Sequence, residues 1–279
     1  MAGAAPIPLW PKGAPGQKFA PGPEHDATTA KDNVVGGRAV IRLANVTEPS
    51  ITFYPAPKGN NSGATVLVFP GGGYSILALD LEGSEICEWL NSIGVNAALV
   101  KYRVPQPPAA VHHAAPLQDA QRAIGLVRQH ATEWRVDPQR IGVLGFSAGG
   151  HLAALVSNRY AERAYPAVDE MDSVSCRPDF VILIYPAYLA AKDDNKALAP
   201  EFQLSAQTAP TFIVQTEDDP VHVENSLVYY RALKDARVEG ELHLFSKGGH
   251  GYGMRPSALA VTGWPKLAET WLRGRSIIK

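Results

Sequence analysis

A serine flanked by two glycines, at the junction of an apolar run and an amphipathic stretch, limits most strongly how this chain can fold. Residues 140–144 predict a buried strand and residues 148–160 a helix, with Gly-Phe-Ser-Ala-Gly between them. A serine on so sharp a turn needs neighbours without side chains two positions away on each side, and Gly145 and Gly149 meet that demand. The free N–H groups at the start of the following helix would favour negative charge nearby. The pattern predicts that Ser147 is a nucleophile, and its alternative is an ordinary glycine-rich turn.

The remainder of the chain repeats the same order of strand and helix. Short connections between such units favour a mostly parallel sheet with helices on both faces. The N-terminal part differs, because residues 38–46 and 51–54 predict an antiparallel edge, while residues 1–33 are rich in Pro and Gly and predict an irregular arm. We therefore expect an α/β class protein with one domain over residues 34–279. Further strands are predicted over residues 64–69, 95–100, 180–184, 211–215 and 241–245, and further helices over 80–92, 116–134, 223–236 and 257–272.

Composition excludes several classes of function. The 279 residues carry 26 Lys and Arg against 27 Asp and Glu, so no basic excess would attract nucleic acid or a membrane surface. The longest apolar run, residues 180–185, is far shorter than the roughly 20 residues that a membrane helix needs. Residues 1–6 lack the charged start and apolar core of a signal peptide. We expect either a cytoplasmic protein or a secreted one whose signal has been removed.

Cysteine and histidine usage gives no sign of a metal or cofactor. Cys87 and Cys176 are too few for a disulfide framework or a four-cysteine zinc site, although one bridge between them stays open. No His, Cys and Asp residues follow one another at metal-ligand spacing, so we expect neither metal nor cofactor. The polar surface is expected for His25, His112, His113 and His130, whereas His151, on the predicted helix after Ser147, is expected to be a buried hydrogen-bonding residue.

A run of three glycines follows the predicted strand over residues 64–69. The sequence Pro-Gly-Gly-Gly-Tyr at residues 70–74 would expose backbone N–H groups at the carboxyl end of that strand, where an oxyanion hole is built. The alternatives are a flexible turn or a phosphate loop, but no Gly-Lys-Ser/Thr follows and dinucleotide spacing is absent. Tyr74 and Tyr185 are candidate walls of a substrate pocket, or else ordinary packing residues.

Two later loops offer an acid and a base. Asp218 and Asp219 follow the predicted strand over residues 211–215, and Asp219 is the better placed when counted from the strand start, with Asp218 as the alternative. His250 follows the last strand between two glycines, which leave its ring room to reach Ser147. Serine, aspartate and histidine thus follow one another in the chain order that is typical of enzymes whose serine lies on such a strand-to-helix turn.

These motifs together resemble the α/β-hydrolase serine esterases, over nearly the whole chain from about Ile7. The glycine loop looks like the His-Gly-Gly-Gly loop of the hormone-sensitive-lipase-like group, with Pro70 in place of the histidine. The sequence is more similar still to a bacterial subgroup that includes acetyl-xylan and feruloyl esterases. That resemblance implies an oxyanion hole formed by Gly72, Gly73 and Ala148. It rests on Pro8 to Pro11, Pro70 to Tyr74, Asp80 to Gly83, Leu117 to Ala123, Gly145 to Leu152, Val223 to Ser226 and Gly248 to Gly251.

The function expected from these residues is hydrolysis of short-chain acyl esters through an acyl-enzyme, on a small-molecule or carbohydrate-linked ester such as acetylated xylan. A short acyl group is expected because residues 186–210, the only candidate lid, contain a solvated run at 192–196 and no apolar helical pattern. A feruloyl esterase, a prolyl-oligopeptidase-like peptidase and a non-catalytic ligand-binding relative are the alternatives. The oligomeric state is open.

Overall fold

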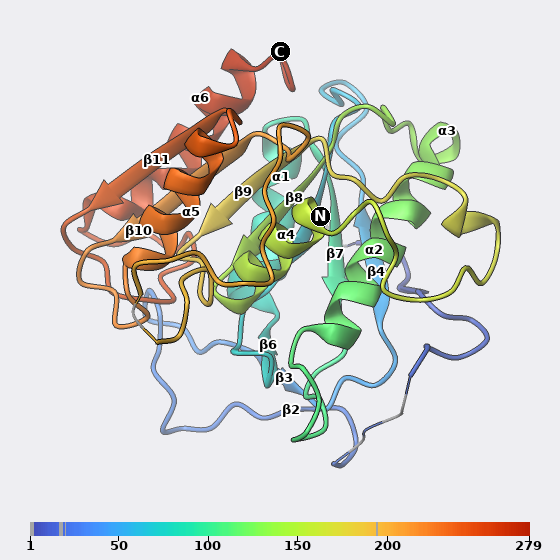
Figure 1. Cartoon of the computed structure of the whole chain (residues 1–279), viewed down its shortest axis with the longest axis horizontal. Helices are drawn as coiled ribbons and strands as arrows, with labels where there is room; N and C mark the ends of the chain where they lie inside the picture. The colour runs from blue at the N-terminus through green and yellow to red at the C-terminus, as the bar shows by residue number, and fades with distance from the viewer. Residues whose placement is uncertain (1–2, 17–18, 20, 194) are drawn as a thin grey trace.

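A computed structural model describes residues 3–16, 19, 21–193 and 195–279. Its described part contains an eight-stranded sheet in the order β1-β4-β7-β5-β8-β9-β10-β11 (Figure 1). The pairs from β7 to β11 are parallel, and β4 and β1 add an antiparallel edge. This arrangement matches the predicted sheet. The strands span Ile7–Pro8 (β1), Ser50–Tyr54 (β4), Thr65–Phe69 (β5), Asn96–Lys101 (β7), Ile141–Phe146 (β8), Phe180–Ile184 (β9), Thr211–Thr216 (β10) and Gly240–Phe245 (β11).

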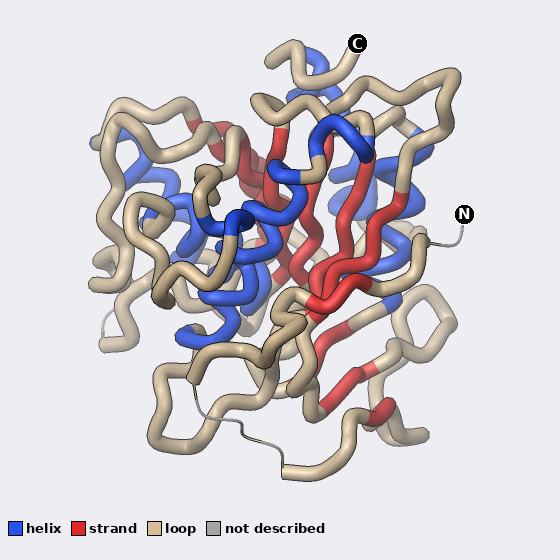
Figure 2. Tube along the Cα trace, turned by 90° about the vertical axis from the view of Figure 1, so that its right-hand side faces the viewer, coloured by secondary structure: helices blue, strands red, loops and turns tan. Residues whose placement is uncertain are grey.

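Helices cover both faces of the sheet, and Figure 2 shows the layer of strands between them. The sheet separates two hydrophobic cores, and successive side chains of β5 point into one or the other. Leu67 packs in the first core and Val68 in the second, and both are fully buried. That two-sided burial explains why β5 is a continuous apolar run. One core is covered by α2 (Ala114–Gln129), α4 (Ala148–Asn158) and α5 (Glu224–Asp235), and the other by α1 (Glu85–Ser92) and α6 (Trp264–Gly274).

A second, three-stranded antiparallel sheet corrects the prediction for the N-terminal edge. It contains β2 (His25–Asp26), β3 (Arg42–Ala44) and β6 (Ile76–Ala78). The strand predicted over residues 38–46 is thus shorter and belongs to this sheet, because Asn45 takes a left-handed conformation (φ 59°) that ends it. Strand β6 has only three residues, too few to show alternation in the sequence.

The predicted irregular arm is partly ordered into the domain. Its residues 7 and 8 form β1 through backbone pairing with β4, which requires no apolar periodicity. Leu9 is fully buried, and the indole Nε1 of Trp10 donates to Asp119 Oδ1 at 2.7 Å. This part of the arm therefore packs into the core, while residues 1–2, 17–18 and 20 of the predicted arm lie outside the described residues.

Three of the predicted helices divide at their ends. The helix predicted over residues 80–92 begins with a π-helical turn, η1 (Asp80–Ser84), before α1 starts, and α3 (Ala131–Trp134) is separate from α2. The last helix begins later than predicted, because a 3-10 turn, η3 (Ala260–Gly263), precedes it and Pro265 lies in its first turn. No helix in the described part of the chain is long and apolar enough to cross a bilayer.

Candidate active site

Ser147 sits at a strained junction between β8 and α4. Its φ of 50° and ψ of −118° are rare for a residue with a side chain, and α4 begins at the next residue. A Cβ on Gly145 would lie 2.0 Å from the carbonyl oxygen of Gly149, and one on Gly149 would lie 2.1 Å from the carbonyl oxygen of Phe69. The turn therefore requires both glycines, for the steric reason that the sequence indicated.

Ser147, His250 and Asp219 form one hydrogen-bonded chain. His250 Nε2 lies 2.9 Å from Ser147 Oγ, and His250 Nδ1 lies 2.9 Å from Asp219 Oδ2. The three residues follow β8, β11 and β10, so the carboxyl ends of parallel strands bring them together. With Nδ1–H donating to the carboxylate, Nε2 is free to accept the serine proton. The histidine side chain is 23% exposed and the aspartate side chain is buried, so an incoming group can reach the imidazole and the serine but not the carboxylate.

The structure gives the two neighbouring aspartates different contacts. The carboxylate of Asp219 also accepts from the backbone N–H of Val221 at 2.7 Å and from Gln215 Nε2 at 3.2 Å, which fixes its orientation toward His250. Asp218 instead accepts the backbone N–H groups of Gly249 and Gly248, at 2.8 and 3.0 Å. These bonds, that from Gly249 above all, lower the pKa of the Asp218 carboxyl. Asp218 thus holds the loop that carries the histidine and does not contact the imidazole.

The glycine loop lies against the serine. A Cβ on Gly71 would approach the Ser147 Cβ to 2.9 Å. In the described part of the chain, no hydrogen bond uses the backbone N–H of Gly72, Gly73 or Ala148. Ala148 is the first residue of α4, where N–H groups have no partner within the helix. The three predicted oxyanion donors are therefore on segments that border Ser147 and remain available to an acceptor.

A buried carboxylate beneath this loop was missed by the sequence analysis. Glu82, in η1, accepts the Gly71 N–H at 2.6 Å on one oxygen and the Tyr185 hydroxyl at 2.8 Å on the other. The Tyr185 hydroxyl in turn accepts the Gly253 N–H at 3.1 Å. Burial raises the pKa of Glu82, and its two hydrogen bonds oppose that rise. Glu82 thereby joins the glycine loop to the loop that carries His250, and its only sequence signal was its place in the Asp80 to Gly83 motif.

Replacing Glu82 with glutamine is expected to lower kcat about 10- to 100-fold with little change in KM, since a small misplacement near reacting groups has such effects. An amide offers one acceptor oxygen, so one of the two donors would face an NH₂ group, at a cost of about 1–3 kcal/mol in unfolding free energy. Ester hydrolysis kinetics and urea denaturation would measure both. Glu88→Gln, on the exposed side of α1, is the matched control and should change neither. An unchanged kcat in the Glu82 variant would contradict the positioning role.

The two tyrosines predicted as pocket walls are buried. Tyr185 is fully buried and Tyr74 is 3% exposed, which matches the alternative that the sequence left open, that both are packing residues. Their side chains face inward because each hydroxyl is held inside, by Glu82 for Tyr185 and by His151 for Tyr74. Tyr188 is 49% exposed and stacks on Tyr74 with ring centroids 6.3 Å apart. The sequence could not predict this exposed position of Tyr188, because residues 186–210 have no periodic pattern.

The histidine predictions hold for His151 and fail for His113. His151 is 1% exposed, with Nδ1 2.8 Å from the Tyr74 hydroxyl and Nε2 3.3 Å from Glu201 Oε1. His113 is not a simple surface residue, because its half-buried ring lies against that of His151 at a centroid distance of 5.2 Å. Linear spacing could not show this group, since its members come from three separate segments. Cys87 and Cys176 are both buried and unpaired.

The chain resembles known proteins in sequence and in structure. Residues 66–204 match the family described as the alpha/beta hydrolase fold. An acetyl ester-xyloside bifunctional hydrolase from Caldicellulosiruptor lactoaceticus has 35% sequence identity and a TM-score of 0.76, covering 99% of this chain and 97% of that one. The chain belongs to the α/β-hydrolase family. This membership confirms the fold class and the family that the motifs predicted.

Several proteins with similar sequences carry the names of ester hydrolases. An acetylxylan esterase from Xylanibacter ruminicola is 32% identical over 218 residues, which are 70% of this chain and 42% of that protein. An ethyl acetate hydrolase from Pseudomonas putida is 28% identical over 222 residues, covering 69% of this chain and 67% of that protein. The chain thus spans less than half the length of the acetylxylan esterase.

Proposed function

We propose that this chain is a serine carboxylesterase that hydrolyses short-chain acyl esters through an acyl-enzyme intermediate. The observation that carries the proposal is the chain of two 2.9 Å contacts from Ser147 Oγ through His250 to Asp219. It lies beside the unused N–H groups of the glycine loop. A hydroxyl, a base and oxyanion donors in one place are the groups that acyl transfer requires.

Acylation would start with proton transfer from Ser147 Oγ to His250 Nε2 as Oγ attacks the ester carbonyl carbon. The carbonyl oxygen becomes an anion, which the N–H groups of Gly72, Gly73 and Ala148 would stabilise. Each such donor contributes roughly 10²–10³ in rate in serine hydrolases. Asp219 keeps the proton on Nδ1 and stabilises the imidazolium. When the tetrahedral intermediate collapses, the bond to the alkoxy oxygen breaks and the alcohol leaves with the proton from Nε2.

Deacylation would repeat these steps with water. His250 Nε2 accepts a proton from the water molecule as its oxygen attacks the acyl carbon of the Ser147 ester. The same N–H groups bind the second oxyanion. Its collapse returns the proton from Nε2 to Ser147 Oγ and releases the carboxylic acid. The protein therefore ends the cycle in its starting protonation state.

The segment between β9 and β10 supports a small acyl group on a bulky alcohol. Its described residues, 186–193 and 195–210, form no helix, and Lys192 and Asp193 are exposed. A lid of this kind provides no apolar helix to cover a long acyl chain. The names of the acetylxylan esterase and the acetyl ester-xyloside hydrolase support an acetyl group on a carbohydrate.

A substrate series tests this proposal. With p-nitrophenyl esters from acetate to laurate, we expect kcat/KM to be highest for acetate and to fall with chain length. Acetylated xylan should release acetate, whereas methyl ferulate and a peptide anilide should be poor substrates. The Ser147→Ala variant supplies the blank. A laurate optimum would contradict the short-acyl proposal, and preferred cleavage of methyl ferulate or of the anilide would favour a feruloyl esterase or a peptidase.

A further inference from the structure

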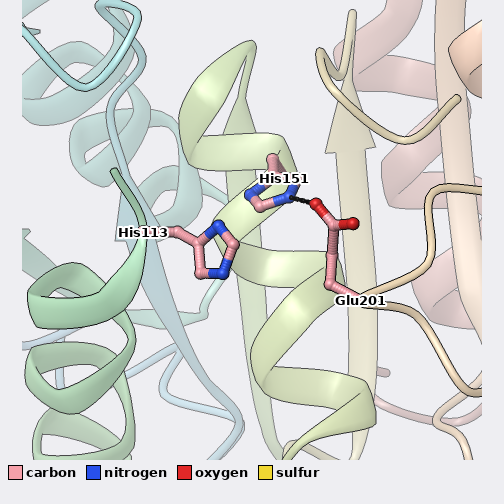
Figure 3. A group of neighbouring side chains, drawn as sticks. All are labelled: His113, His151 and Glu201. Atoms are coloured by element: carbon pink, nitrogen blue, oxygen red, sulfur yellow. Dashed lines mark hydrogen bonds and ion pairs between the residues drawn. The ribbon is translucent and has the colours of Figure 1, made fainter. Parts of the chain in front are cut away.

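A second group of reactive side chains lies outside the triad (Figure 3). It contains His113, just before α2, His151 in α4, and Glu201 in the segment between β9 and β10. One nitrogen or oxygen atom of each lies within 4.8 Å of those of the other two. In Figure 3 the ring of His151 lies between the ring of His113 and the carboxylate of Glu201, to which a dashed line joins it. No step of the proposed ester hydrolysis uses these residues.

Two imidazoles and one carboxylate are a ligand set that zinc sites with an open fourth position use. Ligands at tetrahedral angles, with bonds of about 2.0–2.1 Å, lie roughly 3.3–3.4 Å apart. His151 Nε2 and Glu201 Oε1 are 3.3 Å apart, which matches this spacing. One ring nitrogen of His113 lies within 4.8 Å of a ligand atom of each of the other two residues, so binding requires its ring to move closer. We propose that His113, His151 and Glu201 bind a divalent transition metal ion, for which zinc is the best match.

The hydrogen bond between His151 and Tyr74 supports this proposal. A metal-bound histidine usually donates its other ring N–H to a fixed oxygen, which orients the ring. His151 Nδ1 is 2.8 Å from the hydroxyl oxygen of Tyr74, and both side chains are buried. With Nε2 on the metal, Nδ1–H would donate to that oxygen.

The hydrogen bond between His151 and Glu201 accounts for only two of the three residues. It gives no reason for a second imidazole to lie against the first, with ring centroids 5.2 Å apart. A shared ion accounts for all three. The charges permit it, because Glu201 contributes a negative charge, while Arg159 adds a positive charge near His113 that weakens affinity. We therefore expect weaker binding than at thiolate zinc sites, which supply more negative charge.

The bound ion would tie together three segments around the nucleophile. His151 lies one helical turn after Ser147, Tyr74 follows Gly73, and Glu201 belongs to the segment that borders the site. An ion at this position would brace the loop and the helix without touching the ester. We expect zinc to raise the melting temperature, and the metal-free protein to retain esterase activity. The inference does not depend on the proposed function, because its test measures binding.

The test is titration of the EDTA-dialysed full chain with ZnCl₂ by calorimetry and with CoCl₂ by visible absorption. We expect about one ion per chain and an intense tetrahedral cobalt band. His113→Ala and Glu201→Gln should weaken binding at least about 10-fold, since loss of even an outer-shell partner has that effect. His112→Ala, a change to the adjacent exposed histidine, is the matched control and should bind like the wild type.

Two results would overturn the metal site. One is an absence of zinc and cobalt binding to the wild-type chain at about 100-fold molar excess. The other is binding in both ligand variants with wild-type affinity, which would place the ion elsewhere. Glu201→Gln is a conservative change of a side chain that is 26% exposed, so it should fold, and circular dichroism without metal would verify this. The two variants are designed to leave the buried His151 in place.

Discussion

Replacing Ser147 with alanine is expected to lower kcat for p-nitrophenyl acetate by a factor of about 10⁶, the loss found for the serine of a comparable triad. The variant lacks the oxygen that attacks the ester, while the N–H groups of the glycine loop still polarise a bound carbonyl. A residual rate above that of the uncatalysed reaction should therefore persist. The small side chain of alanine fits the same strained turn, so the melting temperature should change little. Initial rates and thermal denaturation measure the two effects.

Ser157→Ala is the matched control for this variant. Ser157 lies in the same helix, α4, is fully buried, and its hydroxyl has no hydrogen-bond partner in the described structure. Removing that hydroxyl should leave kcat unchanged and should not destabilise the protein. Retention of wild-type activity in Ser147→Ala would show that another residue attacks the ester.

Replacing Asp219 with asparagine is expected to lower kcat by about 10⁴. The amide has nearly the same shape as the carboxylate, but its NH₂ group can point at His250 Nδ1. The imidazole would then carry its proton on Nε2, where it cannot accept the proton of Ser147. The loss of negative charge also removes the stabilisation of the imidazolium. Steady-state kinetics with p-nitrophenyl acetate would measure the decrease.

Asp218→Asn separates the two adjacent aspartates. Asp218 accepts the N–H groups of Gly248 and Gly249 and lies 3.8 Å from Lys247 Nζ, and an asparagine oxygen can accept both N–H groups. We therefore expect a loss of less than about 10-fold, from a slightly less ordered histidine loop. A larger loss in Asp218→Asn than in Asp219→Asn would show that the acid of the triad is misassigned.

The parallel core of the fold was predictable because burial on both faces leaves a clear trace in the sequence. Strand β5 shows this most plainly, since all five of its residues are buried and all but Thr65 are apolar. The small sheet was not predictable in the same way. Strands β2 and β6 have two and three residues and are held by backbone hydrogen bonds, which select no particular side chains. Leu9 and Trp10 likewise contact Arg122 and Asp119, which lie 113 and 109 positions away in the chain.

Ser147 and His250 could be placed from sequence because each lies in a glycine-containing motif after a predicted strand. Gly145 and Gly149 are needed beside Ser147, and glycines flank His250. The choice between Asp218 and Asp219 was harder, because adjacent residues on one turn differ only in the direction of their side chains. The contacts of Glu82 and Tyr188, and the group formed by His113, His151 and Glu201, could not be predicted, since the neighbours come from distant segments. The sequence could not decide between a pocket wall and a packing residue for Tyr185, because its partner Glu82 is distant in the chain.

The most direct test of the central claim is to trap the nucleophile. The wild-type chain would be treated with a fluorophosphonate, which forms a phosphorus–oxygen bond to an activated serine and releases fluoride, and tryptic peptides would be analysed by mass spectrometry. We predict one adduct, on Ser147 within the peptide of residues 141–159, and none in Ser147→Ala. An adduct on a different residue, an adduct that persists in the alanine variant, or no adduct at all would contradict the account.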